Sequence, residues 1–164
     1  MRKLLLALLC CMLCTAGMQA QTQLLLEDFS TATATTPPMG WVQNVITGDP
    51  LVDQWQFSKP GTRDLNAPLT SPAAIFDSDN FSNNSLAEDV ALESPAFDAS
   101  GQTIVNLTFD HFFNQFLNSG YNVEVFDGTS WVTVLSGTVS TANPASESID
   151  ISAQAAGVAN ARVR

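Results

Sequence analysis

Short runs of alternating apolar and polar residues recur along the chain and predict β-strands. The clearest run is 103–113 (TIVNLTFDHFF), in which every second residue from Val105 to Phe113 lies on one face. Another is 121–126 (YNVEVF), after which Asp127-Gly128 begins a short hairpin loop that leads to a returning strand at 131–135. Further strands are expected at 23–29, 42–46, 54–58, 74–76, 90–92, 149–152 and 161–164.

No stretch has the apolar spacing of a long amphipathic helix, although residues 153–160 (AQAAGVAN) suffice for one helical turn. The segments between the expected strands are short and rich in Gly, Pro, Asn and Asp, which favour turns. Many short strands without helices between them are typical of antiparallel sheets. The sequence therefore predicts an all-β fold, an antiparallel β-sandwich, in a single domain at 21–164.

Residues 1–20 do not fit this pattern. A basic start (Met1-Arg2-Lys3) precedes an apolar run from Leu4 to Leu13, and small residues follow near Ala20. This is the arrangement of a secretory signal peptide, and the apolar run is too short to span a bilayer. We expect cleavage after Ala20, with cleavage after Gly17 as the alternative, and therefore a secreted or cell-surface protein without a transmembrane segment.

Removal of this leader changes both the cysteine content and the charge. All three cysteines (Cys10, Cys11 and Cys14) lie in it, so the mature chain has no disulfide, which favours a bacterial exported protein. The mature chain keeps four basic residues against all 16 acidic residues, a formal charge of −12. Such a surface repels phosphate backbones, so nucleic acid is not expected as a partner.

The stretch 73–98 holds an Asp/Asn/Ser loop that begins at Asp77 and contains Asp79. Four of the six residues at the ligand positions of an EF-hand loop suit calcium, but Phe81 and Ser82 stand where an oxygen ligand and a glycine are needed. The flanks also predict strands, so an EF-hand is not favoured. Two interpretations stay open: a looser calcium site, and a solvated loop whose side chains bind their own backbone.

The sequence offers little for catalysis. His111 is the only histidine, and it lies on the apolar face of its expected strand, where a structural role is favoured. A histidine-based metal site is excluded by this count, no Cys–His pair exists in the mature chain, and no serine lies in a nucleophile-elbow pattern. We expect no enzyme activity.

Other residues that suit ligand binding have structural alternatives. Trp41, Trp55 and Trp131 are able to stack on sugar rings, but tryptophans of a β-sandwich also fill its core. Glu27 ends the first expected strand, where a charge also serves to discourage edge-to-edge aggregation.

A series of motifs resembles the cleaved-adhesin or choice-of-anchor J domains of secreted Bacteroidetes proteins, which are related to MAM-like jelly rolls. The motifs are an acidic residue before Phe29, Pro38-Met39-Gly40-Trp41, AIFDSDN, and LESPAFDASG followed by TIVNLTFDHFF. The hairpin YNVEVFDGTSWVTVL also fits, and the resemblance covers nearly all of residues 24–164.

The resemblance implies a jelly-roll β-sandwich that acts as a non-catalytic module beside other domains of a larger exported protein. It also implies a structural calcium ion, for which Glu27 and Asp77 or Asp79 are the candidate ligands. The family's final strand is missing after Arg164, so we expect the domain to be truncated at its C-terminal strand.

Two functions follow as hypotheses. The first is an extracellular adhesion or ligand-binding module, stabilised by calcium, whose ligand is a protein or a glycan. The alternative is a carbohydrate-binding module that targets an attached hydrolase, with Trp41 and Trp131 as the candidate sugar-contacting residues.

Overall fold

The computed structural model describes residues 21–57, 65–69, 72–81 and 87–164. The expected signal peptide and the second half of the Asp/Asn/Ser loop lie outside the described residues. Within the described ranges, no helix has the length and apolar character needed to cross a membrane.

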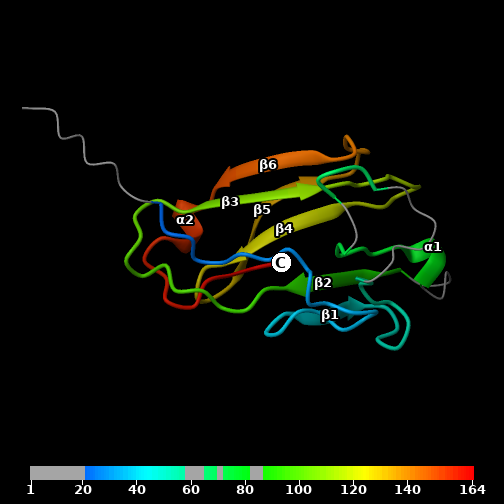
Figure 1. Cartoon of the computed structure of the whole chain (residues 1–164), viewed down its shortest axis with the longest axis horizontal. Coiled ribbons are helices and arrows are strands. Elements are labelled where there is room, and N and C mark those ends of the chain that lie inside the picture. Colours follow the sequence, from blue (N-terminus) through cyan, green and yellow to red (C-terminus); the bar gives the residue numbers. More distant parts are fainter. Residues whose placement is uncertain (1–20, 58–64, 70–71, 82–86) are drawn as a thin grey trace, which may run out of the picture.

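The described residues contain seven strands and two helices of four residues each (Figure 1). This confirms the prediction of an all-β fold with antiparallel pairing. In chain order the elements are β1 (Val42–Thr47), α1 (Ser78–Phe81), β2 (Asp89–Glu93), β3 (Asn106–His111), β4 (Tyr121–Phe126), β5 (Trp131–Gly137), β6 (Ala145–Asp150), α2 (Ser152–Ala155) and β7 (Arg162–Val163).

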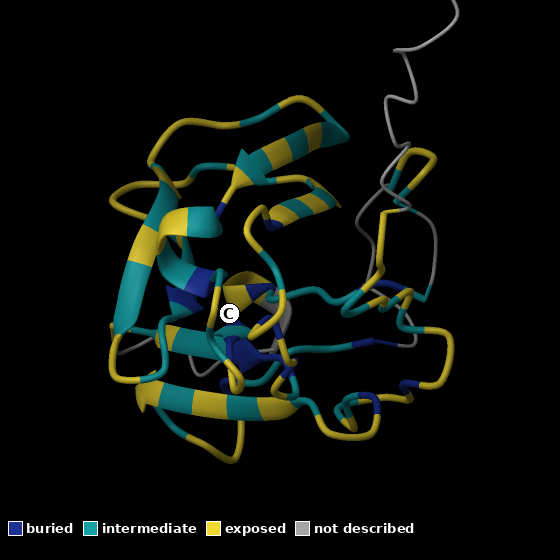
Figure 2. Ribbon diagram, turned by 90° about the vertical axis from the view of Figure 1, so that its left-hand side faces the viewer, coloured by how far each residue is buried: buried dark blue, intermediate teal, exposed yellow. Residues whose placement is uncertain are grey.

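Three antiparallel sheets make up this fold, with the strand orders β1-β2, β3-β6 and β5-β4-β7. Strands β4 and β5 form the hairpin that the Asp127-Gly128 turn predicts, with Phe126 opposite Trp131. Strands β3 and β6 are joined in register from Asn106 and Asp150 to His111 and Ala145. In Figure 2, exposed and half-buried residues alternate along the strands, as expected where one face of a sheet meets solvent.

The main core lies between the β3-β6 sheet and the β5-β4-β7 sheet. Val125 of β4 and Ile151 are almost completely buried at its centre, and half-buried Leu107, Val134 and Ile149 pack against it. Two sheets that bury one face each against the other form two layers. The remaining buried members of this cluster are Phe97, Ala99, Val105, Ala155, Ala161 and Val163.

A smaller core forms around Phe57, which is fully buried. The rings of Phe29 and Phe57 lie 5.8 Å apart, and Phe29 also contacts Trp41 at 5.6 Å between ring centres. Leu92 of β2 and half-buried Trp55 complete the packing. This second core joins the N-terminal segment to the β1-β2 sheet.

The C-terminal strand β7 connects these two regions. On one side it pairs with β4, and on the other its neighbour Ala161 pairs with Phe97. The Ser94 N–H also donates to the Val163 carbonyl at 2.9 Å. The chain segment that continues β2 therefore runs antiparallel to β7, and β7 lies between β2 and β4 as Figure 1 shows.

Three of the predicted strands are wrong. The described part of 54–58 and the segment 74–76 share only an isolated bridge between Gln56 and Ile75. Residues 23–29 form no strand, and side chains at the end of this segment bind the local backbone. The Glu27 carboxylate accepts the Phe29 N–H at 2.6 Å, and the Asp28 carboxylate accepts the Ser30 N–H at 2.9 Å. Phe29 has a φ of 59°, a left-handed conformation that ends an extended segment.

The turn between β4 and β5 gives a prediction for acidic pH. The hydroxyl of Thr129, followed by the backbone N–H groups of Ser130 and Thr129, lowers the pKa of Asp127 from 3.8 to about 2. A lowered pKa stabilises the fold above the unfolded value and loses this effect as the pH falls through the folded value. We therefore expect the stability difference between the parent and Asp127→Asn to be constant above pH 5 and to vanish between pH 4 and pH 2. Urea unfolding at several pH values measures this difference, and a difference that does not change below pH 4 would contradict the prediction.

Candidate functional site

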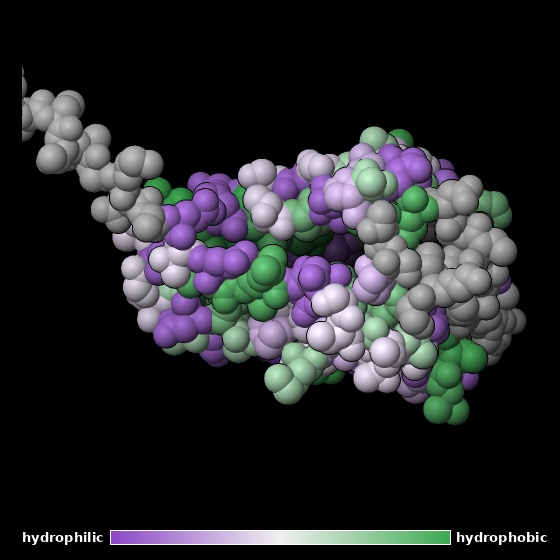
Figure 3. Space-filling model, in the orientation of Figure 1, coloured by the Kyte–Doolittle hydropathy of each residue, from purple (hydrophilic) through white to green (hydrophobic). Residues whose placement is uncertain are grey.

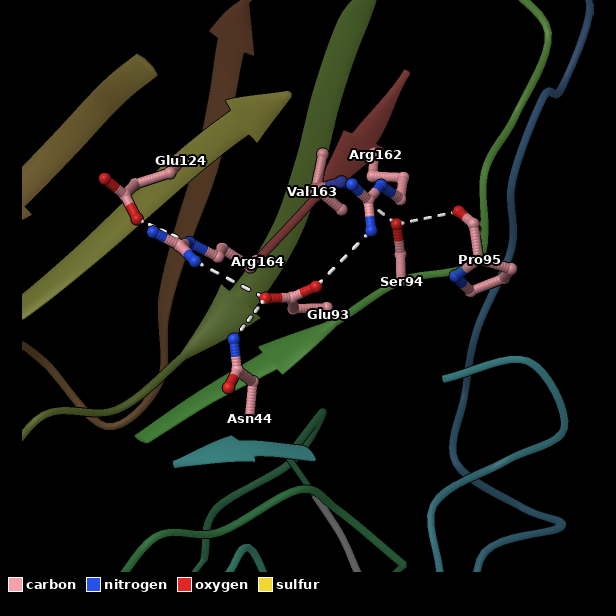
Figure 4. A network of polar contacts seen from close by, with 8 residues as sticks. All are labelled: Asn44, Glu93, Ser94, Pro95, Glu124, Arg162, Val163 and Arg164. Carbon is pink, nitrogen blue, oxygen red and sulfur yellow. Dashed lines mark hydrogen bonds and ion pairs between the residues drawn. The ribbon is translucent and has the colours of Figure 1, made fainter. Parts of the chain in front are cut away.

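A group of charged and aromatic side chains surrounds β7. Its centre is Glu93, at the end of β2, which is only 8% exposed. The Glu93 carboxylate contacts Arg162 at 3.5 Å and Arg164 at 3.4 Å, and it accepts a hydrogen bond from the Asn44 amide at 3.0 Å (Figure 4). Three strands, β1, β2 and β7, therefore meet at one carboxylate.

Arg164 links this group to β4. Its Nε donates to the Glu124 carboxylate at 2.6 Å, and the two backbones exchange hydrogen bonds of 2.9 Å in both directions. The hydroxyl of Ser94 accepts the Val163 N–H at 2.9 Å. These contacts hold β7 on both sides through side chains as well as through the sheet.

Two aromatic rings lie beside the arginines. The Arg162 guanidinium is 4.5 Å from the ring centre of Phe126 and 5.1 Å from that of Trp131. The Arg164 guanidinium is 4.4 Å from the Trp131 ring centre. All three distances lie within the range of a favourable interaction between a cation and an aromatic ring.

These side chains share one face of the sheet. Phe126 stands opposite both Trp131 and Arg162 in the register, and the neighbouring Val125 and Val163 point into the main core. Successive residues of a strand alternate between faces, so this face is the one turned away from that core. We call this face, together with the two side chains of the β1-β2 sheet that contact it, the Arg–Trp face. It consists of Glu124, Phe126, Trp131, Arg162 and Arg164, with Asn44 and Glu93 from the β1-β2 sheet.

The Arg–Trp face is partly open to solvent. The side chain of Arg162 is 34% exposed and that of Glu124 is 21% exposed. Figure 3 shows hydrophilic residues interspersed with hydrophobic ones over the side of the molecule that Figure 1 presents. Such a surface offers planar donors, carboxylate acceptors and an indole ring to a ligand.

The two tryptophans expected to contact sugar lie in different places. Trp131 belongs to the Arg–Trp face, where the arginines cover part of its ring. Trp41 is half-buried and packs in the second core against Phe29. The structure therefore places only Trp131 among polar groups suited to ligand recognition.

The three predicted calcium ligands have different local environments. The Glu27 carboxylate holds the Phe29 N–H, Asp77 is buried immediately before α1, and Asp79 is exposed within α1. Among the described residues, no three Asp, Glu, His or Cys side chains form a group suited to a metal ion. Calcium at Glu27, Asp77 and Asp79 stays a prediction.

His111 takes part in a cluster between the sheets. Its Nε2 lies 3.3 Å from the Glu147 carboxylate of β6, and its ring contacts Tyr121 and Phe109. The aromatic neighbours agree with the apolar face predicted for this strand. The partner Glu147 lies 36 residues away, so the local pattern did not reveal it.

Sequence reasoning missed most of the Arg–Trp face. The alternation of Arg162, Val163 and Arg164 predicted a strand with both arginines on one face, but not the carboxylates opposite them. Glu93 stood in the motif LESPAFD, where it was counted only among the acidic residues. Arg162 and Arg164 are the only Lys or Arg residues within the described ranges, so many acidic residues compete for two cations. This excess of acidic residues was the one feature of the sequence that pointed to carboxylates beside the two arginines.

Comparisons of the chain with protein-family models, curated proteins and solved structures gave no match. The resemblance to cleaved-adhesin and choice-of-anchor J domains therefore rests on the sequence motifs alone.

Proposed function

We propose that the chain is a non-catalytic, ligand-binding module of a larger exported protein, with the Arg–Trp face as its binding surface. The observation that carries this proposal is the gathering of two arginines, two glutamates and an indole ring on one partly exposed sheet face. The signal-peptide pattern supports an extracellular location. The motif resemblance supports a choice-of-anchor J domain with a jelly-roll fold.

The chemistry of the face favours a neutral, polar ligand. The positive charges of Arg162 and Arg164 are balanced by the carboxylates of Glu93 and Glu124. The charge of the chain as a whole is −10. A highly charged anion such as nucleic acid would therefore be repelled, whereas a protein surface or a glycan would not.

A specific observation also supports the alternative, a carbohydrate-binding module. Trp131 presents an indole ring beside guanidinium and carboxylate groups, and sugars combine apolar ring faces with hydroxyl groups. Strands fix these side chains before binding, which lowers the entropy lost in the complex. Adhesion to a glycan and targeting of an attached hydrolase would both use this surface.

Arrays of glycans and of extracellular matrix proteins, probed with the mature chain 21–164, test the proposal. We expect binding that Trp131→Ala weakens by about tenfold or more, as for a central aromatic contact. Phe116→Ala is the matched control, because this side chain is 66% exposed and lies outside the Arg–Trp face. Circular dichroism of each variant separates loss of binding from loss of fold.

The two hypotheses predict different arrays. Binding to glycans favours the carbohydrate-binding module, and binding to matrix proteins favours adhesion. A ligand that binds the parent and Trp131→Ala equally, but loses affinity in Phe116→Ala, would place the binding surface elsewhere.

A further inference from the structure

The two arginines of β7 have different environments. Figure 4 shows Arg164 between two carboxylates, with its Nε 2.6 Å from Glu124 and its Nη1 3.4 Å from Glu93. The side chain of Arg164 is 15% exposed. Arg162 approaches the Glu93 carboxylate at 3.5 Å through its Nη1, and its side chain is 34% exposed. The fold therefore holds Arg164 firmly, whereas Arg162 is held more weakly and is more accessible to a ligand.

Most of the hydrogen-bonding capacity of Arg162 is unused within the described part of the chain. A guanidinium group carries five N–H donors in a planar fork. Among the described residues, the Glu93 carboxylate is the one acceptor that this guanidinium contacts, and 3.5 Å is long for a hydrogen bond between nitrogen and oxygen. Four donors of Arg162 therefore stay available to water or to a ligand.

Aromatic rings restrict the position of the Arg162 guanidinium. Its central carbon lies 4.5 Å from the ring centre of Phe126 and 5.1 Å from that of Trp131. The two rings contact each other at 5.5 Å between their centres. Phe126 stands opposite both Trp131 and Arg162 in the strand register, so backbone pairing places all three side chains. An arginine that is positioned in advance loses less conformational entropy when it binds a ligand.

The groups beside Arg162 define the kind of ligand that it suits. The Glu93 carboxylate is an acceptor close to the fork, so a second carboxylate bound to Arg162 would be repelled by Glu93. A hydroxyl group accepts one hydrogen bond and donates another, so it is able to bind Arg162 and Glu93 together. Two adjacent hydroxyl groups also match two N–H donors of one fork. Trp131 supplies an apolar ring beside them, as the ring carbons of a sugar require.

We propose that Arg162 determines the specificity of the Arg–Trp face, and that the ligand is a neutral sugar with two adjacent hydroxyl groups. These hydroxyl groups accept hydrogen bonds from the Arg162 guanidinium and donate to the Glu93 carboxylate. The inference rests on the proposed function, because it assigns a ligand class to the same surface. Arg164 is a positioning residue that holds β7 in the sheet.

Isothermal titration calorimetry of the mature chain 21–164 with defined oligosaccharides tests the ligand class. The neutral probes with adjacent free hydroxyl groups on every unit are cellohexaose, xylohexaose and mannohexaose. Laminarihexaose is the matched control for cellohexaose, because it is also built of glucose but its linkage separates the free hydroxyl groups of the inner units. Hexagalacturonate adds a carboxylate to each unit. We expect at least one neutral probe to bind, and both laminarihexaose and hexagalacturonate to bind at least tenfold more weakly.

Two conservative variants separate recognition from folding. Arg162→Lys keeps the charge but replaces the planar fork by one ammonium group, so we expect it to weaken binding of the preferred probe about tenfold or more. Its thermal midpoint should stay within about 2 °C of the parent, because the contact with Glu93 is long and partly exposed. Arg164→Lys loses the Nε donor to Glu124 and should lower the midpoint by about 4 °C or more.

The possible outcomes distinguish this inference from the proposed function. A parent that binds none of the neutral probes, or that binds laminarihexaose or hexagalacturonate as tightly as the preferred probe, would overturn the assigned ligand class. Equal affinity of the parent and Arg162→Lys, together with weaker binding by Trp131→Ala, would overturn the role of Arg162 and leave the Arg–Trp face as the binding surface. Equal affinity of the parent and both variants would contradict the proposed function as well.

Discussion

Replacement of Glu93 by alanine is expected to lower the free energy of unfolding by about 2–4 kcal/mol. Loss of one partner of a buried ion pair costs about 3–5 kcal/mol, because the other charge stays behind without compensation. Here the side chain of Arg164 is 15% exposed and that of Arg162 is 34% exposed, so both arginines recover part of their hydration. The expected loss of about 2–4 kcal/mol is therefore smaller than the general cost of breaking a buried ion pair.

Urea unfolding of the parent and Glu93→Ala measures this loss, and Glu147→Ala is the matched control. Glu147 also contacts a basic side chain, but its own side chain is 32% exposed and it has a single partner, His111. Exposed ion pairs contribute about 0–1 kcal/mol, so the control should lose no more than this. Equal losses in the two variants would show that Glu93 does not act as the centre of the group around β7.

Phe57→Ala is expected to lower the free energy of unfolding by about 3–5 kcal/mol, the usual loss for a large buried aromatic side chain. Phe57 is fully buried, contacts the ring of Phe29, and is the largest fully buried side chain of the second core. Its removal leaves a cavity between the N-terminal segment and the β1-β2 sheet. Thermal and urea unfolding measure the loss.

The matched variant for Phe57→Ala is Phe116→Ala, which removes the same atoms from a position that is 66% exposed. Substitutions at such positions usually change stability by no more than about 0.5 kcal/mol. A loss below about 1 kcal/mol for Phe57→Ala would contradict the assignment of Phe57 to a closely packed core.

The strands with strong alternation were predictable because their pattern is local. The alternation at 103–113 and 121–126 identified β3 and β4, and Asp127-Gly128 identified the hairpin between β4 and β5. The first half of β6 was not predicted, because Ala145 to Ser148 contains only one apolar residue. Its conformation is set by pairing with β3, which is information that the segment itself does not carry.

The Arg–Trp face was not predictable from local patterns. Glu93 and Arg162 are 69 residues apart, and their contact depends on the insertion of β7 between β2 and β4. Trp131 had two interpretations, as a core residue or as a sugar-contacting residue. The register with Phe126 and the position of Arg162 place it on the outer sheet face, away from the main core.

The burial of Asp53 shows the same limit. The cluster of acidic residues in the Asp/Asn/Ser loop made Asp77 and Asp79 the candidate calcium ligands. Asp53 had no distinguishing neighbour in the sequence. Its burial, with an Oδ1 that has no hydrogen-bond partner within the described residues, follows from the close fold of the loop after β1.

The insertion of β7 between β2 and β4 underlies the proposed binding surface, and hydrogen exchange of the mature chain tests it most directly. The Val163 N–H donates to the Ser94 hydroxyl, and the Arg164 N–H donates to the Glu124 carbonyl, both at 2.9 Å. We expect these two amides to exchange as slowly as those of β4, because both depend on opening of the same sheet. Exchange of both amides at the rate of an unprotected chain would show that β7 is not held in the sheet, and would contradict the Arg–Trp face as described.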